Sequence, residues 1–157
     1  MIYDSQIVTP REISKITDRI YIGTYHSATM LDFTNSAGIT HVLNCTPDPH
    51  DGLSKFRVSQ LNINDGYEIP FDTIQFALGF IDKAVRDGKV LVHCHAGVSR
   101  SVSLVCAHLM RAGFSWDEAL EFVRSKRPQA FPHPKIERSI KQFFGNTINA
   151  KTTMLGE

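Results

Sequence analysis

The sequence has few cysteines, no long apolar run and no excess of charge of either sign. Its three cysteines, Cys45, Cys94 and Cys106, are too few and too scattered for a disulfide framework or for paired Cys-x-x-Cys zinc ligands. No apolar run is long enough to cross a bilayer, and the first ten residues lack the charged-then-apolar order of a signal peptide. Seventeen basic and sixteen acidic residues give a net charge of +1, so no global field attracts nucleic acid or an anionic membrane.

These absences lead to expectations about where the protein acts and with what. We expect a cytoplasmic location, with entry into a nucleus by diffusion if the source is eukaryotic. We expect no membrane span and no nucleic-acid partner, and we assume a monomer. Any recognition of an anion must therefore come from a local arrangement of residues rather than from the net charge.

Apolar patterning along the 157 residues predicts one domain in which strands alternate with helices. Alternating or continuous apolar runs predict strands at 19–23, 39–45, 56–63 and 89–92. Helical spacing predicts helices at 27–37, 71–87, 101–111, 115–127 and 134–144. Residues 145–157 are polar, and we expect a flexible tail there. This order predicts an α/β sandwich whose partly parallel sheet is flanked by helices.

Capping signals support several of these helix boundaries. Ser27 is expected to cap the first helix and Gly38 to end it. Gly113 is expected to end the helix at 101–111. Ser115 stands three residues before Glu118, which is the spacing of a capping box.

One stretch, His93-Cys94-His95-Ala96-Gly97-Val98-Ser99-Arg100-Ser101, lies between a predicted buried strand and a predicted helix. A loop in this position directs unpaired backbone N–H groups and the positive end of the helix dipole at one point, which suits a tetrahedral oxyanion. Gly97 would let the backbone curl so that successive amides converge, and Arg100 would add a planar cation for two phosphate oxygens. The same donors favour the thiolate of Cys94, which the pattern places for in-line attack on phosphorus.

A metal site is the alternative interpretation of this stretch. His93, Cys94 and His95 are all possible ligands, but neighbouring residues on a strand point to opposite faces and no fourth ligand follows at the usual spacing. We therefore predict neither a metal nor a cofactor. Cys106 lies on the apolar stripe of the following helix, and we predict that it is a small core residue.

The motif His-Cys-x-x-Gly-x-x-Arg-Ser resembles the signature of the cysteine-dependent protein tyrosine phosphatases, and AGVSRS is most similar to the dual-specificity branch. Other segments of the chain resemble the same branch in the same order, namely KITDRIYIG, GITHVLNCTPD and SWDEALEFVRSKRP. The resemblance therefore covers about residues 16–144. It implies a single catalytic domain over 1–157 with the tyrosine phosphatase-like fold, a central, mostly parallel sheet of about five strands flanked by helices. The chain resembles the small, atypical members, because nothing resembles a docking or carbohydrate-binding module.

The resemblance also implies a role for each residue of the loop. Cys94 would be the nucleophile, Arg100 the phosphate clamp, and Ser101 the hydroxyl that assists breakdown of the phosphoenzyme. His93 would orient and tune the thiolate from the end of the strand. The phosphate itself would be bound by His95, Ala96, Gly97, Val98, Ser99 and Arg100.

The family further requires a carboxylic acid that protonates the leaving group, on a loop before the nucleophile. Asp65 follows the strand predicted at 56–63 and precedes the long helix, which is the matching place. Asp72 is the competitor, although the Pro70 that precedes it suggests a position in the first helical turn. We predict that Asp65 is the acid.

Cys45 has two open interpretations. Sequential strands of an α/β sheet often pair, so the strand that ends at Cys45 is expected to adjoin the one that ends at Cys94. Peroxide could then convert Cys94 to a sulfenic acid that Cys45 captures as a reversible disulfide, an arrangement that resembles lipid phosphatases of the superfamily. Alternatively, Cys45 simply fills a small buried space.

The substrate class follows from what the resemblance does not include. Nothing resembles the Lys-Asn-Arg-Tyr loop of tyrosine-only phosphatases, so a shallow pocket should accept phosphoserine and phosphothreonine beside phosphotyrosine in proteins. The loop lacks the lysines of inositol-lipid phosphatases. The chain departs from the family at His108, where a tyrosine is usual, and at His133, where an asparagine is usual. A silent phosphate-binding adaptor and a phosphatase for lipids or RNA 5′-phosphates are the alternatives.

Overall fold

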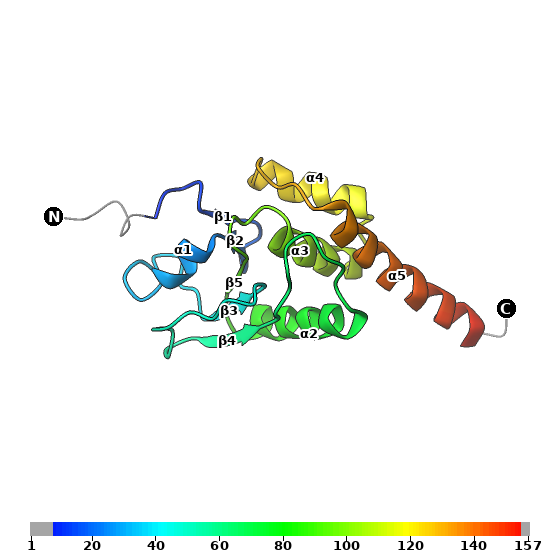
Figure 1. Ribbon diagram of the computed structural model, residues 1–157, viewed down its shortest axis with the longest axis horizontal. Helices are drawn as coiled ribbons and strands as arrows, with labels where there is room; N and C mark the ends of the chain where they lie inside the picture. The colour runs from blue at the N-terminus through cyan, green and yellow to red at the C-terminus, as the bar shows by residue number, and fades with distance from the viewer. Residues whose placement is uncertain (1–7, 155–157) are drawn as a thin grey trace.

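Five strands and five helices make up residues 8–154, the part of the chain that the computed structural model describes (Figure 1). The strands are β1 Ile13–Lys15, β2 Ile20–Gly23, β3 His41–Asn44, β4 Arg57–Gln60 and β5 Val90–His93. The helices are α1 Tyr25–Thr29, α2 Phe71–Asp87, α3 Arg100–Arg111, α4 Trp116–Lys126 and α5 Pro134–Met154. The strand order is β1-β2-β5-β3-β4, in which only β1 runs antiparallel to its neighbour. The predicted sheet of about five mostly parallel strands is confirmed.

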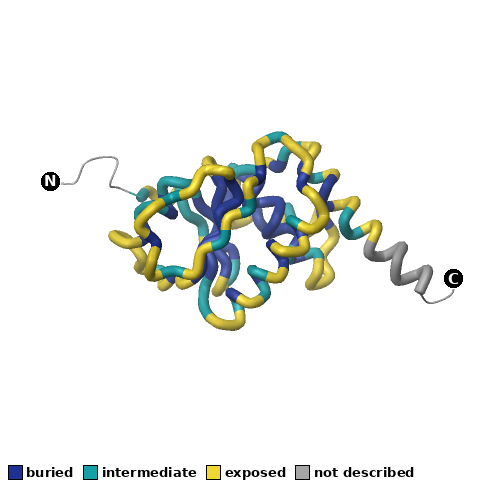
Figure 2. Tube along the Cα trace, turned by 60° about the horizontal axis from the view of Figure 1, so that its bottom comes forward, coloured by how far each residue is buried: buried dark blue, intermediate teal, exposed yellow. Residues whose placement is uncertain are grey.

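Side chains from the strands alternate between two apolar layers. Val42 and Leu91 pack on one face with Leu31, which follows the short helix α1. Leu43 and Val92 point to the opposite face, where α2, α3, α4 and α5 supply the larger cluster. Figure 1 shows α1 on the side of the sheet away from these four helices, and Figure 2 shows the buried chain concentrated between the layers.

Strand β5 occupies the middle of the sheet, and this position decides where the loop after it lies. All four residues of β5 are buried, because β2 and β3 pair with it on its two edges and helices cover both faces. The loop that follows His93 therefore starts at the carboxyl edge of the sheet between two parallel strands, which is where such sheets bind ligands.

The helix predicted at 27–37 is wrong. Helix α1 ends at Thr29, and Thr24 is its N-cap, because the Thr24 hydroxyl accepts from the backbone N–H of Ser27. The Asn35 side chain accepts from the backbone N–H of Ile39 and donates to its carbonyl, at 2.8 and 3.0 Å. These local bonds compete with helical ones and hold the segment in turns.

The strand predicted at 56–63 is shorter than expected. Strand β4 ends at Gln60, since Asn62 has a left-handed backbone with φ of 52°, which a regular strand does not accommodate. The bend directs residues 63–65 toward the loop after β5. Strand β1 was not predicted, because three edge residues have too little apolar patterning to reveal a strand.

Two predictions about the last helices had different outcomes. The capping box at the start of α4 is confirmed, since Ser115 and Glu118 each bond the other's backbone N–H. Helix α5 continues past 144 to Met154, so the expected flexible tail at 145–157 is helical through most of its length. Gly145 costs a helix about 1 kcal/mol without ending it. Residues 155–157 lie outside the described residues.

Candidate active site

The loop after β5 connects His93 directly to helix α3. Cys94 is the first loop residue and is 3% exposed, while Arg100 begins the helix. The backbone N–H groups of residues 95–99 donate to no acceptor within residues 8–154. Such groups at the start of a helix are ready donors for an oxyanion.

Gly97 is required at its position by conformation and by space. Its φ is +66°, in the left-handed region, and a Cβ placed there would lie 2.6 Å from Nη2 of Arg127 and 2.7 Å from the carbonyl oxygen of Gly23. The signature glycine thus lets the loop pass between strand β2 and a side chain from the end of α4.

The Ser101 hydroxyl lies beside the Cys94 thiol. Their Oγ and Sγ atoms are 3.2 Å apart, and Ser101 is fully buried in the first turn of α3. The structure therefore places the predicted hydroxyl where a hydrogen bond can stabilise negative charge on sulfur.

Arg100 points toward the acid predicted from sequence. Its Nη1 donates to the Ile63 carbonyl at 2.9 Å, and its Nε lies 3.9 Å from Oδ1 of Asp65. The guanidinium is buried, and its Nε has no hydrogen-bond partner among the described residues, whereas the Asp65 side chain is 68% exposed. Asp72 lies in the first turn of α2, as expected. The structure thus brings Asp65 to Arg100.

A pocket of about 350 Å³ opens above Cys94. Its lining comprises Asp65, Cys94, His95, Ala96, Val98, Ser99, Arg100, Phe131, His133 and Pro134. Phe131 was missed in the sequence, because no local pattern connects it with the loop. Its backbone N–H donates to the Val98 carbonyl at 2.8 Å, and the His133 N–H donates to the Ser99 hydroxyl at 2.8 Å.

His93 lies under the loop as a neutral, fully buried ring. Its Nδ1 is 3.2 Å from the Cys94 carbonyl oxygen and its Nε2 is 3.0 Å from Nε2 of His50. Burial lowers the pKa of His93 to about 3, against a smaller opposite effect of the bond to Cys94. A neutral ring that donates from Nδ1 to Cys94 and accepts from His50 satisfies both contacts. His50 was not predicted from sequence.

His95 contributes its backbone to the pocket, and its ring is engaged elsewhere. Nε2 lies 2.6 Å from Oδ2 of Asp48, and the ring stacks on Tyr25 with 5.0 Å between centroids. Tyr25 also donates its N–H to the His95 carbonyl. These contacts anchor the second residue of the loop to the segment after β3 and to α1.

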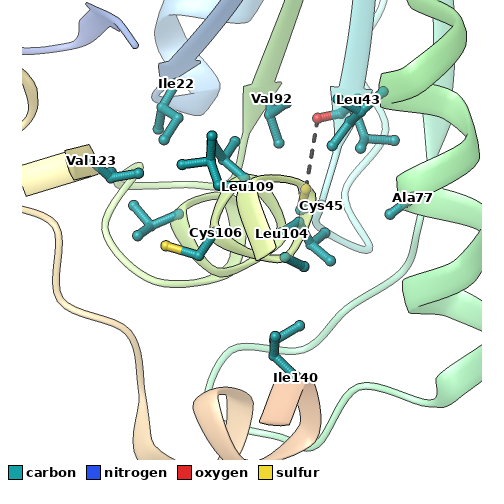
Figure 3. Close-up of a cluster of buried hydrophobic side chains, with 14 of the residues drawn as sticks. Ile22, Leu43, Cys45, Ala77, Val92, Leu104, Cys106, Leu109, Val123 and Ile140 are labelled. Atoms are coloured by element: carbon teal, nitrogen blue, oxygen red, sulfur yellow. Dashed lines mark hydrogen bonds between the residues drawn. The ribbon is translucent and has the colours of Figure 1, made fainter. Parts of the chain in front are cut away.

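Cys45 lies beside Cys94, because β3 pairs with β5 as expected from the sequence. Its backbone N–H donates to the His93 carbonyl at 2.8 Å, which extends the pairing of β3 and β5 by one residue. Burial raises the pKa of the Cys45 thiol well above its ordinary value, and the nearby charge of Cys94 raises it further. Figure 3 shows Cys45 next to Leu43 in the core, and the thiol is free.

Two other features, a metal centre and a membrane-spanning helix, are absent from the described residues. No group of three or more His, Cys, Asp or Glu side chains in this part of the chain is arranged to hold a metal ion. No helix within the same residues has the length and apolar character needed to cross a membrane.

Comparison with known proteins identifies relatives over most of the chain. Dual specificity protein phosphatase 1B of Arabidopsis thaliana is 37% identical over 142 residues, covering 85% of this chain and 82% of that protein. Dual specificity protein phosphatase 15 of Mus musculus is 29% identical over 134 residues, covering 83% of this chain and 57% of that protein. This chain therefore spans little more than half of the mouse relative.

Solved structures show the same fold. A mouse dual specificity phosphatase complexed with zinc tungstate superposes with a TM-score of 0.81 at 27% identity, over 93% of this chain and 94% of that one. Residues 20–146 match the family model described as dual specificity phosphatase, catalytic domain. The chain therefore belongs to the dual specificity phosphatase family and is a protein phosphatase domain.

Proposed function

We propose that the domain hydrolyses phosphate monoesters of tyrosine, serine and threonine in proteins through a phosphocysteine formed on Cys94. The observation that carries the proposal is the pocket, in which Cys94 and Arg100 of the loop after β5 meet Asp65 from the segment after β4. The solved structure of a mouse dual specificity phosphatase with zinc tungstate supports it, because tungstate is a tetrahedral oxyanion like phosphate.

In the first step, the Cys94 thiolate attacks phosphorus in line with the departing oxygen. Arg100 and the unbonded N–H groups of residues 95–99 would hold the equatorial phosphate oxygens. The buried Nε of Arg100, which lacks a hydrogen-bond partner among the described residues, is available for such an oxygen. Phosphate binding would therefore satisfy donors that the protein itself leaves unpaired.

Asp65 would act as the general acid of this step. Its carboxyl group lines the pocket and is exposed to solvent, so it can reach the leaving oxygen of a bound substrate. Once deprotonated, the same carboxylate would activate the water that attacks the phosphocysteine. Ser101 would donate a hydrogen bond to sulfur as that bond breaks, because its Oγ is 3.2 Å from Sγ.

The rim of the pocket is open enough for phosphorylated side chains of different length to reach Cys94. Asp65 and Phe131 are two of its lining residues, and each is 68% exposed, so the rim does not enclose an aromatic ring. A rim of this kind accepts phosphotyrosine against Phe131 and still lets a shorter phosphoserine approach Cys94. The cytoplasmic location, the monomeric state and the lack of a nucleic-acid partner stay predictions.

Hydrolysis of p-nitrophenyl phosphate at about pH 6 in excess chelator tests the proposal, with Cys94→Ser as the key variant and Cys106→Ala as its control. We expect chelator-resistant, vanadate-sensitive turnover that falls at least about 10⁴-fold in Cys94→Ser and persists in Cys106→Ala. A wild type that binds phosphopeptides without turnover would instead indicate an adaptor. Turnover that survives in Cys94→Ser would exclude the phosphocysteine.

A further inference from the structure

Arg127 is the largest side chain that the structure buries completely, and its position is set by the end of α4. The residue is 0% exposed and follows Lys126, the last residue of the helix. Pro128 comes next, which disfavours a helical backbone at Arg127 and turns the chain at this point. The side chain thereby enters the space beneath the loop after β5.

The guanidinium connects the loop after β5 to strand β1. Nε donates to the Gly97 carbonyl at 2.7 Å and Nη2 donates to the Ala96 carbonyl at 3.3 Å. Nη1 donates to the hydroxyl of Ser14 on β1 at 2.8 Å. Two successive peptide units of the loop are thus held from one side by one planar group.

This contact determines the direction of two amides. The carbonyl and the N–H of a trans peptide unit point in opposite directions. The unit whose carbonyl belongs to Ala96 carries the N–H of Gly97, and the unit whose carbonyl belongs to Gly97 carries the N–H of Val98. Since Arg127 holds both carbonyls, both N–H groups point away from it, and Ala96 and Val98 line the pocket.

Arg127 also lacks an acidic partner. None of the ion pairs formed within residues 8–154 includes Arg127, and all of its bonds go to neutral oxygens. Burial of an unpaired guanidinium costs several kcal/mol. Burial lowers the pKa of Arg127, while the negative charge of Cys94 acts against this and raises it. By reciprocity, Arg127 stabilises negative charge on Cys94 by the same free energy.

We propose that Arg127 is a positioning residue that aims the amides of Gly97 and Val98 into the pocket and places a second buried positive charge behind the bound anion. The inference rests on the proposed phosphocysteine chemistry, since the thiolate and the phosphate are the anions that this charge serves. Arg100 would bind the phosphate inside the pocket, whereas Arg127 holds the loop carbonyls on the side away from the pocket.

The pH dependence of Cys94 alkylation reports the effect of the Arg127 charge on the thiolate. Several other groups near the loop also affect the thiolate. Arg100 and Asp65 face the pocket from α3 and from the loop after β4, and Cys45 and His93 lie beneath it on β3 and β5. These groups are unchanged in variants of Arg127. A shift of the profile on substitution of Arg127 therefore isolates its own contribution.

Three variants separate charge from geometry. Arg127→Gln removes the charge and keeps donors, Arg127→Lys keeps the charge and loses the planar fork, and Ser14→Ala removes only the bond between Arg127 and β1. In each, the rate at which iodoacetamide alkylates Cys94 is followed against pH, with the labelled residue identified by mass spectrometry. Tungstate affinity is measured by thermal shift, and neither readout requires turnover.

We expect Arg127→Gln to raise the midpoint of the alkylation profile by about one pH unit, which means roughly tenfold less thiolate at a given acidic pH. Arg127→Lys should keep the midpoint but weaken tungstate binding about three- to tenfold, because the two carbonyls are no longer held together. Ser14→Ala should lower the melting temperature and change neither readout.

Arg127 would be a purely structural residue if Arg127→Gln folds with an unchanged midpoint and unchanged tungstate affinity. If that variant does not fold, Arg127→Met keeps the apolar stem and allows the same comparison. Hydrolysis by the wild type together with an unchanged midpoint in the variant would overturn this inference alone. A shifted midpoint in a protein that never hydrolyses phosphate would support it and overturn the proposed function.

Discussion

Two cysteines at helix α3 are buried almost equally and have opposite surroundings. Cys94 precedes the first turn and is 3% exposed, with the Ser101 hydroxyl at 3.2 Å and Arg100 in the same pocket. Cys106 lies in the second half of the helix and is 0% exposed, in an apolar cluster that includes Val123 (Figure 3). Burial raises the pKa of Cys106 to about 12.

The difference teaches that burial alone does not decide the chemistry of a thiol. At the start of α3, backbone N–H groups have no partner within the described residues, and two guanidinium groups are close to the loop. In the interior of the same helix, the backbone groups bond one another, and burial among mainly apolar side chains is the largest influence on the Cys106 thiol. A reactive cysteine therefore requires the helix start, and a structural one tolerates its interior.

The largest effect should follow from removing the proposed general acid, Asp65, from the pocket at the start of α3. Asp65→Asn should lower turnover about 10²- to 10⁴-fold for substrates with poor leaving groups, because an amide cannot protonate the departing oxygen. Turnover of p-nitrophenyl phosphate, whose leaving group needs less protonation, should fall less. Steady-state kinetics with a series of aryl phosphates measures the difference.

Asp72→Asn is the matched control for this prediction. Asp72 lies in the first turn of α2 and does not line the pocket. Asp72→Asn should therefore leave turnover at the wild-type level with every leaving group in the series. A leaving-group effect in Asp72→Asn and none in Asp65→Asn would reverse the assignment of the acid.

Low pH should destabilise the buried polar contacts of His93 beneath the loop, whereas the apolar cluster around Cys106 should not respond to pH. The pKa of His93 is about 3 in the folded protein and 6.5 ordinarily, so the unfolded chain binds a proton more readily between these values. The free energy of unfolding should then decrease as pH falls from 6.5 toward 3, by up to roughly 4 kcal/mol for His93 alone. Urea titrations across this range measure the loss.

His93→Asn provides the control, because asparagine does not titrate. Burial lowers the pKa of His41, His50 and His108 as well, so these rings contribute loss in the same direction in both proteins. The variant should be less stable at neutral pH but should show a shallower pH dependence. An equal slope in the two proteins would mean that His93 accepts a proton in the folded state.

A smaller effect should follow from removing the hydroxyl beside Cys94. Hydrogen bonds to charged groups contribute about 1.5–3 kcal/mol, so Ser101→Ala should slow phosphoenzyme breakdown about ten- to a hundredfold. Stopped-flow traces should then show a burst of p-nitrophenol before a slow steady state. Ser103→Ala removes a hydroxyl that bonds the Ser99 carbonyl instead, and no burst is expected from it. A burst in both variants would assign the effect to the helix rather than to Ser101.

The smallest effect on activity should come from the interior thiol. Cys106→Ala should leave kcat unchanged and cost about 1 kcal/mol of stability through a small cavity. In folded protein treated with mild peroxide, Cys106 should stay a free thiol while Cys94 is oxidised. Tryptic mass spectrometry also decides between the two interpretations of Cys45, which predict either a crosslink to Cys94 or a sulfinic acid on Cys94 without one.

Much of the fold and of the phosphate loop could be predicted from the sequence, since their determinants lie close together along the chain. The strand at 89–92, the loop and the helix after it are consecutive, so apolar pattern and glycine position were enough. The errors occurred where side chains override pattern. Bonds between Asn35 and Ile39 hold the segment after α1 in turns, and Asn62 turns the chain out of β4.

Cys94, Gly97, Arg100 and Ser101 could be proposed for the chemistry from the sequence alone, because they lie within one short segment whose backbone positions them. Three other groups reach this segment only through the folding of the chain: Asp65 in front, and His50 and Arg127 behind. Each of these three groups is many residues away along the chain from the segment that it contacts, so no local sequence pattern predicts the contact. The bend at Asn62, the pairing of β3 with β5 and the end of α4 bring them together.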